Sequence, residues 1–309
     1  MHKLSTYSFG IVFSLLLLLL PSWASAQSRT QQFNQLLDKN DTARAQVLLT
    51  QWKKDVPGDP EWYVARYNFL VWSSMKSIVT IGSNPKGNNY MEITPTDTSV
   101  DATPQFMYAD VYYQPKQVAS AIACIDSAIA LFPDRLDLRF GKIYLLGETQ
   151  SYQAFADEIV KTIHYGATFN HNWKWTDGLA IDGGIASFNE SIQSYIVQLY
   201  DTNVDSLGVQ IGQIATAVLQ YDPNNIENLS NLAISYMLAS NYEEALTPLL
   251  KAETVDPTDA IVLSNIAFCY HRINNKEQAI AYYEKSIKYG DREMKAFSYE
   301  QIQLINSEK

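Results

Sequence analysis

The residues best suited to chemistry lie in one short segment, where three aromatic side chains alternate with polar ones. His171, Trp173 and Trp175 are separated by Asn172 and Lys174. Flat rings beside amides can stack on sugar rings and hydrogen-bond to their hydroxyl groups, which makes this segment a candidate ligand loop. The same rings would also seal a core between two helical units. The sequence favours this second interpretation, because large aromatic side chains usually bury most of their area.

The sequence lacks the standard signatures of catalysis, nucleotide binding and metal binding. It has no G-x-S-x-G elbow, no H-E-x-x-H motif and no phosphate-binding glycine loop, and residues 82–87 predict an Asn-Pro turn. His164 and His171 have no recognised ligand spacing. Asp177 and Asp182 do not supply the alternating oxygens of a calcium loop. We therefore expect no enzyme activity, no cofactor and no metal.

The composition indicates a packed and acidic protein. The chain has 309 residues, of which 47% are hydrophobic and 12% aromatic, and its formal net charge is −10. Such a composition supports a hydrophobic core. Because the negative field repels phosphate backbones, we expect no nucleic-acid partner.

An export signal is predicted at the N-terminus. Lys3 precedes an apolar run over residues 11–20, Pro21 ends that run, and Ala24-Ser25-Ala26 supplies the small residues that signal peptidase accepts. We expect cleavage after Ala26, so residues 1–26 are the signal and no membrane span follows. Since Gln27 is not cysteine, a lipid anchor is not indicated. The signal format and the abundance of Asn, Tyr and Gln favour a Gram-negative periplasm, with full secretion left open.

The clearest pattern in the chain is an internal repeat. Asp222-Pro223 recurs as Asp256-Pro257, so the repeat length is 34 residues. Small residues that let two helices approach, and aromatic or aliphatic residues beside them, recur at matching positions. The aligned pairs are Leu229 and Leu263, Leu232 and Ile266, Ala233 and Ala267, Tyr236 and Tyr270, Ala245 and Ala279, and Leu249 and Tyr283. The prolines stand where one helix must end and the next begin.

Residues 222–255 and 256–289 resemble two tetratricopeptide repeats, whose period is also 34 residues. The segments Asn241–Ala245 and Asn275–Ala279 resemble the turn into the second helix of such a repeat. The resemblance implies an all-α fold, a TPR-like right-handed solenoid of antiparallel helical hairpins. In a solenoid, Cys124 and Cys269 would lie several repeats apart, so we expect two small buried residues and no disulfide.

The remaining chain divides into degenerate repeats and two irregular insertions. We expect degenerate helical repeats over 27–75 and 114–165, a helical pair over 188–221 and a capping helix over 290–309. The polar insertion at 76–113 contains the runs 78–81 and 90–93, which can form a small hairpin. The aromatic and glycine-containing insertion at 166–187 has a strand-like period of two.

By the same resemblance, the first helix of each repeat lines a concave groove. The inward positions form an apolar stripe edged by one acid and one base, which suits an amphipathic helix or an extended peptide. These positions are Glu227, Ser230, Ile234, Met237, Leu238, Ile261, Ser264, Phe268, His271 and Arg272. Ser230 and Ile234 stand where peptide-carboxylate-binding members of the family use Lys and Asn, so capture of a free C-terminus is not expected.

These features predict an exported non-catalytic scaffold that binds another protein or a peptide in the bacterial envelope. The alternative is a carbohydrate-binding component of a polysaccharide-uptake system, with the ligand loop His171, Trp173 and Trp175 as its site. A third interpretation is an enzyme with its site in residues 76–113.

Overall fold

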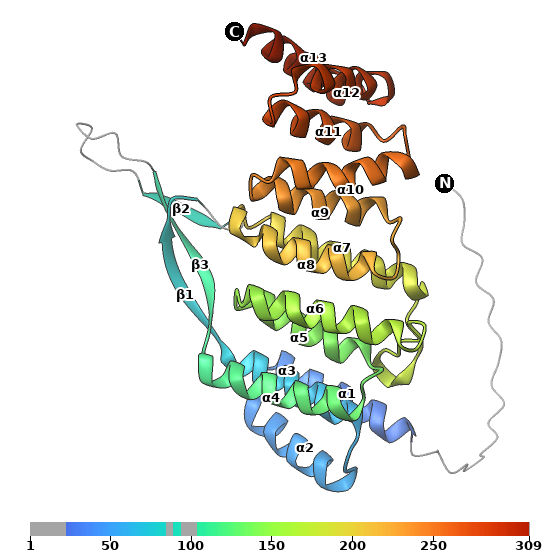
Figure 1. The fold of residues 1–309 in the computed structure, drawn as a ribbon. Helices are drawn as coiled ribbons and strands as arrows, with labels where there is room; N and C mark the ends of the chain where they lie inside the picture. The colour runs from blue at the N-terminus through green and yellow to red at the C-terminus, as the bar shows by residue number, and fades with distance from the viewer. Residues whose placement is uncertain (1–22, 85–88, 94–103, 309) are drawn as a thin grey trace, which may run out of the picture. The chain divides into compact units, whose positions relative to one another are not determined.

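The computed structural model describes residues 23–84, 89–93 and 104–308, which form thirteen α-helices and three β-strands (Figure 1). Of the export signal predicted at 1–26, residues 1–22 lie outside the described part of the chain. The described part of the chain contains no helix long and apolar enough to cross a membrane. Two compact units are present, residues 1–69 and 70–309.

In the first unit, three helices enclose a small core. Helices α1 and α2 span Trp23–Asp38 and Thr42–Asp55, and α3 spans Pro60–Ser74, across the boundary between the units. Trp52 is fully buried among Phe33, Leu49 and Ala65, and its indole N–H donates to the Asp59 carboxylate at 2.8 Å. The buried ring therefore keeps its polar atom satisfied.

The second unit consists of a small sheet followed by ten helices. Strands β1, β2 and β3 span Met75–Gly82, Tyr90–Ile93 and Gln105–Tyr113. Helices α4 to α8 span Pro115–Leu131, Leu136–Glu148, Tyr152–Ala167, Gly184–Tyr200 and Gly208–Leu219. Helices α9 to α13 span Ile226–Leu238, Tyr242–Val255, Ala260–Arg272, Lys276–Tyr289 and Arg292–Ser307. Within this unit, consecutive helices from α8 to α13 pack against one another, as an all-α repeat fold requires.

The same turn joins the two helices of four hairpins. A residue with φ between 54° and 62° ends the first helix, and the next N–H donates to the carbonyl five residues back at 2.8–2.9 Å. This left-handed helix end satisfies carbonyls that would otherwise lack partners. The left-handed residues are Asn40, Gln150, Ser240 and Asn274. None is glycine, so the turns are not evident from the sequence.

A proline joint recurs between hairpins. The residue before each proline donates its N–H to the carbonyl four residues back, at 2.8–3.0 Å, and the chain then turns into the next helix. Proline cannot continue the helix and pushes the preceding residue toward extended backbone. The prolines are Pro57, Pro133, Pro223 and Pro257. Equivalent turns and joints thus run from the N-terminal hairpin to the last one.

The polar insertion predicted at 76–113 holds an antiparallel sheet in the order β1-β3-β2. The runs 78–81 and 90–93 are strands, but they do not form a hairpin with each other. Val79 pairs with Ala109 and Met91 pairs with Met107, so both strands use β3. The expectation of a local hairpin was wrong because the middle strand comes last in the chain.

The second insertion, 166–187, does not form the strand that its alternation predicts. Asn170 and His171 have φ values of 55° and 54°, which fold the chain into a turn directly after α6. Only isolated bridges follow within the described loop, from Lys174 to Arg135 and to Ala180. Gly183, with φ of 73°, precedes α7.

Candidate binding site

Buried charges at the start of α5 hold the aromatic loop, residues 166–187, in place. The guanidinium of Arg135 donates two hydrogen bonds to the Asp137 carboxylate, at 2.7 and 2.8 Å, and both side chains are buried. The Thr176 hydroxyl donates to the same carboxylate at 3.3 Å, and the N–H of Lys174 donates to the Asp134 carbonyl at 2.9 Å. A bidentate arginine–carboxylate pair has a fixed geometry, so it gives Thr176 a fixed partner, and the loop is anchored at Lys174 and Thr176.

Trp173 belongs to the hydrophobic core of the second unit. Its ring is 2% exposed and lies 4.8 Å from Phe169 and 5.9 Å from Phe188, centroid to centroid. The loop also lies close against α6, because a Cβ on Gly166 would approach Trp173 to 2.9 Å. Trp173 therefore cannot offer a ring face to a ligand, although the sequence placed it in the candidate ligand loop.

His171 lies against the same core. Its ring centroid is 5.0 Å from that of Phe188, and burial lowers the pKa of His171 below its usual value. The imidazole is therefore held neutral beside an apolar neighbour. This environment suits packing of the loop better than contact with a charged ligand.

Trp175 remains accessible and lines a preformed cavity. It is 41% exposed and packs edge-on against Phe140 of α5, with ring centroids 6.2 Å apart. The cavity has a volume of about 360 Å³, and its lining is mainly apolar with a few polar groups. The residues lining this Trp175 cavity are Leu136, Phe140, Trp175, Leu179, Ala180, Ile181, Asp182, Ser187, Phe188 and Ser191. Its size falls within the roughly 300–1,000 Å³ typical of ligand pockets.

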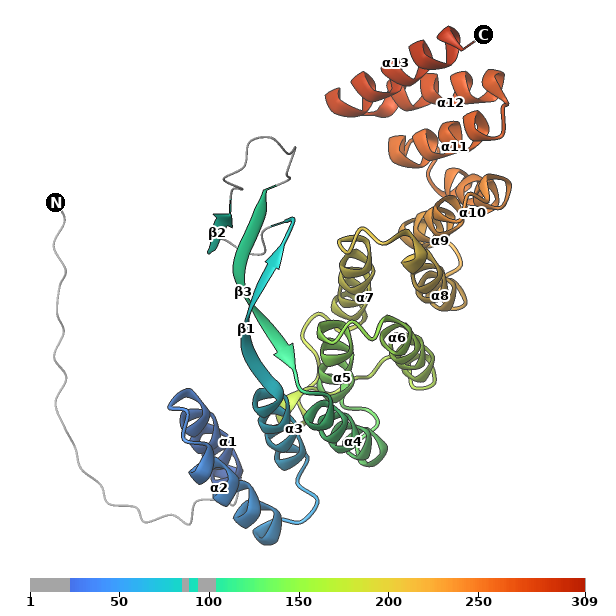
Figure 2. The same cartoon turned by 90° about the vertical axis from the view of Figure 1, so that its left-hand side faces the viewer.

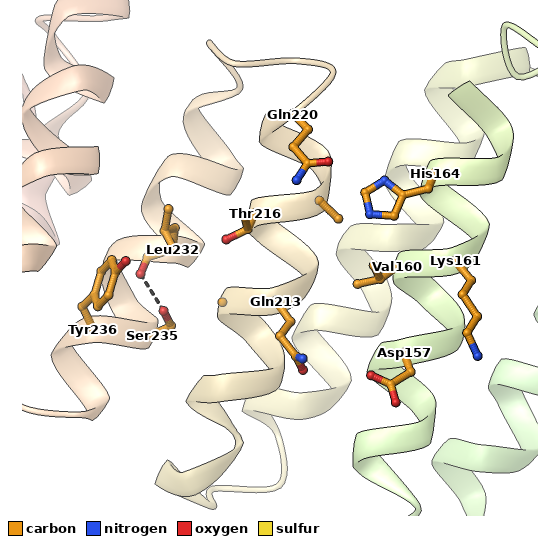
Figure 3. Close-up of a pocket in the computed structure, with 12 residues that line it drawn as sticks. Asp157, Val160, Lys161, His164, Gln213, Thr216, Gln220, Leu232, Ser235 and Tyr236 are labelled. Atoms are coloured by element: carbon orange, nitrogen blue, oxygen red, sulfur yellow. Dashed lines mark hydrogen bonds between the residues drawn. The ribbon is translucent and has the colours of Figure 1, made fainter. Parts of the chain in front are cut away.

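A second and more polar cavity lies where α6, α8 and α9 meet (Figure 3). Its volume is about 550 Å³, and it is lined by Asp157, Val160, Lys161, His164, Gly212, Gln213, Thr216, Ala217, Gln220, Leu232, Ser235 and Tyr236. Gly212 lets α8 and α9 approach closely beside this cavity, since a Cβ there would approach the Ser235 hydroxyl to 2.7 Å. Amides and hydroxyls such as Gln213 and Thr216 can pair with a peptide backbone.

Comparison with known proteins identifies the repeat. A family model described as the tetratricopeptide repeat matches residues 260–289, which include α11 and α12. Residues 260–289 are therefore a tetratricopeptide repeat. No curated protein matches it.

Solved structures that align with this chain include three repeat proteins. YrrB, described as a TPR protein with an unusual peptide-binding site, aligns with a TM-score of 0.38 at 16% identity over 60% of this chain and 84% of its own. A tetratricopeptide repeat protein from Parabacteroides merdae aligns with a TM-score of 0.35 at 12% identity. The alignment covers 93% of this chain and 95% of that protein. The C-terminal part of a TPR repeat-containing protein from Cytophaga hutchinsonii aligns with a TM-score of 0.40 at 11% identity. The alignment covers 84% of this chain and 78% of that chain.

The groove positions predicted on α9 differ in their exposure. Glu227 is exposed, while Ser230, Ile234, Met237 and Leu238 are half-buried. Met237 packs against the core shared by α9, α10 and α11, and the side chain of Leu238 lies close to Gly208 of α8. Much of this predicted stripe therefore contributes to packing between repeats.

The α11 positions are brought together only in part. Ile261 is exposed and Ser264 is buried. The Arg272 guanidinium lies 5.0 Å from the Tyr242 ring centroid and 5.9 Å from that of Phe268, a cation–π cluster. His271 Nε2 lies 3.1 Å from the Glu308 carboxylate of the C-terminal segment. None of the ten groove positions lines the two cavities described above, and their role in binding stays a prediction.

Histidine and carboxylate side chains do not gather into a metal site in the described part of the chain. His164 Nδ1 lies 3.0 Å from the Tyr221 hydroxyl, so its ring pairs with a neighbouring helix end rather than with His171. Sequence reasoning missed Phe140, Phe188 and Leu179 of the Trp175 cavity. Two of these come from helices that are far apart in the chain, and no local pattern marks them.

Proposed function

We propose that the protein is an exported, non-catalytic scaffold that binds another protein or a peptide in the bacterial envelope. The observation that carries this proposal is the Trp175 cavity, a preformed apolar hollow on a repeat scaffold. Its lining of Phe140, Leu179, Ile181 and Phe188 matches one large apolar side chain of a partner. The polar cavity of Figure 3 supplies amides and hydroxyls for further peptide contacts.

The carbohydrate alternative requires aromatic rings that face solvent. Trp173 is buried, so Trp175 alone could stack on a sugar. The Trp175 cavity has mainly apolar walls, whereas sugar hydroxyls need hydrogen-bonding partners when they are buried. An apolar peptide anchor therefore fits this cavity better than a glycan.

The proposal is tested by peptide selection on the chain 27–309, followed by affinity measurement with Trp175→Ala. We expect the variant to bind a selected peptide at least about tenfold more weakly, because truncating a central tryptophan anchor typically costs more than about 1.4 kcal/mol. The matched control is Trp72→Ala, since Trp72 is 37% exposed but lies on α3, outside the cavity. We expect the control to stay within about twofold of wild type.

Two results would contradict the proposal. Equal affinity of wild type and Trp175→Ala for every selected peptide would remove the cavity as the peptide site. Retention on a glycan array that Trp175→Ala abolishes would support the carbohydrate alternative instead.

Export is tested separately, by mass analysis of the protein recovered from the envelope of an expressing cell. The expected N-terminal residue is Gln27.

A further inference from the structure

One face of the β-sheet carries no charged side chain. The strand register places alternate residues of β1, β2 and β3 together on this surface, which we call the uncharged sheet face. It consists of Met75, Ser77, Val79, Ile81, Met91, Ile93, Gln105, Met107, Ala109, Val111 and Tyr113. The opposite face includes Lys76, Glu92 and Asp110, so the charges of the sheet lie on one side only.

Much of the uncharged sheet face is exposed, while Ile93, Gln105, Met107 and Tyr113 are half-buried. Val79 is 70% exposed, Met91 64%, Ile81 57%, Val111 44% and Met75 40%. Figures 1 and 2 show the far end of the sheet standing away from the helices of the second unit, so these helices do not cover it there. Contiguous apolar patches are uncommon on soluble proteins and mark interaction surfaces. Covering this apolar face would stabilise the sheet, because it removes apolar surface from water.

The open edge of the central strand is less suited to pairing than the face. Strand β2 pairs with Gln105–Tyr108, and among the described residues this ladder does not extend along the same edge of β3 toward Tyr113. There the N–H of Val111 donates to the Asp110 carboxylate at 2.8 Å. A charged side chain at a strand edge opposes the addition of another strand. A partner is therefore better suited to pack on the uncharged sheet face than to add a strand at this edge.

The lack of charged side chains on this face suits a second copy of this chain as its cover. The chain carries a net charge of −10, so two copies repel each other wherever their acidic surfaces meet. The uncharged sheet face avoids this repulsion except near Tyr113, whose hydroxyl donates to the Glu148 carboxylate at 2.9 Å. A two-fold axis places the face against itself, and two sheets with the same twist pack face to face in aligned β-sandwiches. A membrane surface is a poorer match, because Lys76 is the only cation among the strand residues and Glu92 and Asp110 oppose it.

We propose that the uncharged sheet face packs against the same face of a second copy, forming a symmetric dimer. The test is sedimentation equilibrium of the chain 27–309, run as wild type and as two adjacent lysine variants. Val79→Lys places a charge on the uncharged sheet face, and Ile78→Lys places one on the opposite face of the same strand. We expect wild type to dimerise reversibly, Val79→Lys to dimerise at least about tenfold more weakly, and Ile78→Lys to stay within about threefold of wild type.

Circular dichroism shows whether both variants fold, and the neighbouring Ile78→Lys control separates dimer loss from disruption of the sheet. A wild-type chain that stays monomeric at about 100 µM would overturn the proposal, since weak homodimers form at this concentration. A wild-type dimer that Val79→Lys leaves intact would do the same. If wild type is monomeric but floats with phosphatidylglycerol vesicles, and Val79→Lys does not float, the face binds membranes and the second copy is rejected.

Discussion

Trp173 and Trp175 lie two residues apart, but replacing each by alanine should have different effects on stability and binding. Trp173 is 2% exposed and touches Phe169 and Phe188, and the Arg139 guanidinium lies 5.6 Å from its ring centroid. Trp175 is 41% exposed and borders a cavity. Trp173→Ala should therefore destabilise the second unit strongly, while Trp175→Ala should mainly affect binding.

The magnitudes follow from the area that each ring buries. A buried tryptophan removes up to about 250 Å² from water, and about 25 cal/mol per Å² makes Trp173→Ala cost roughly 4–5 kcal/mol once the retained Cβ is discounted. The cavity that the ring leaves behind adds to this cost. Trp175 buries little more than half of its area, so the same calculation gives Trp175→Ala at most about 2.5 kcal/mol, with no internal cavity. The expected difference is about 2 kcal/mol or more.

Denaturant unfolding followed by far-ultraviolet circular dichroism measures both variants. A repeat protein can unfold in stages, so the transition that contains α5 to α8 is the one to compare. Trp173→Phe serves as a matched control, since an aromatic ring refills most of the space and should recover most of the loss. Equal destabilisation by Trp173→Ala and Trp175→Ala, or a Trp173→Ala variant as stable as wild type, would refute this description of the loop.

Two further predictions concern backbone strain and pH. Gln150→Gly and Ser240→Gly should each raise the free energy of unfolding by up to about 1 kcal/mol, because both positions hold φ values of 54° and 61° that glycine adopts without penalty; chemical denaturation checks this, and an unchanged or lower stability would contradict it. Burial lowers the pKa of His171, so the unfolded chain binds more protons and stability should fall as the pH drops below about 6.5. His171→Asn, at a left-handed position that asparagine tolerates, should remove that part of the loss in unfolding curves recorded at a series of pH values, and identical pH dependence in both proteins would disprove it.

The repeats were predictable because a strong local pattern coincides with the tertiary packing. The 34-residue spacing set by Pro223 and Pro257 fixes where helices end, and Ala233 and Ala267 mark close approach. Both alanines are fully buried, as that interpretation requires. The degenerate hairpins have the same turn geometry without the sequence pattern. Residues such as Gln150 occupy left-handed turns that the sequence alone does not reveal.

The insertions were harder to predict because distant residues decide their structure. The strand-like runs at 78–81 and 90–93 were recognised, but their partner is β3, which is rich in aromatic and β-branched residues such as Phe106 and Val111. The sequence therefore does carry a local signal for β3. Alternation in the aromatic loop was misleading, since Asn170 and His171 reverse the chain. Nothing local in the sequence brings Phe140 and Phe188 together beside Trp175.

The buried charges behind the aromatic loop are best explained by the need for a fixed cavity. Arg139 is buried, donates to the Pro133 carbonyl at 3.1 Å and lies 4.5 Å from the Tyr165 ring centroid. Burial lowers the pKa of Arg139, and the Glu158 carboxylate 3.8 Å away opposes that shift. Buried ion pairs contribute little net stability compared with apolar packing. They do restrict the loop to one conformation, and a cavity that is already formed loses less entropy when a ligand binds. The small net stability of these ion pairs is therefore consistent with a role in holding Trp175 at the edge of its cavity.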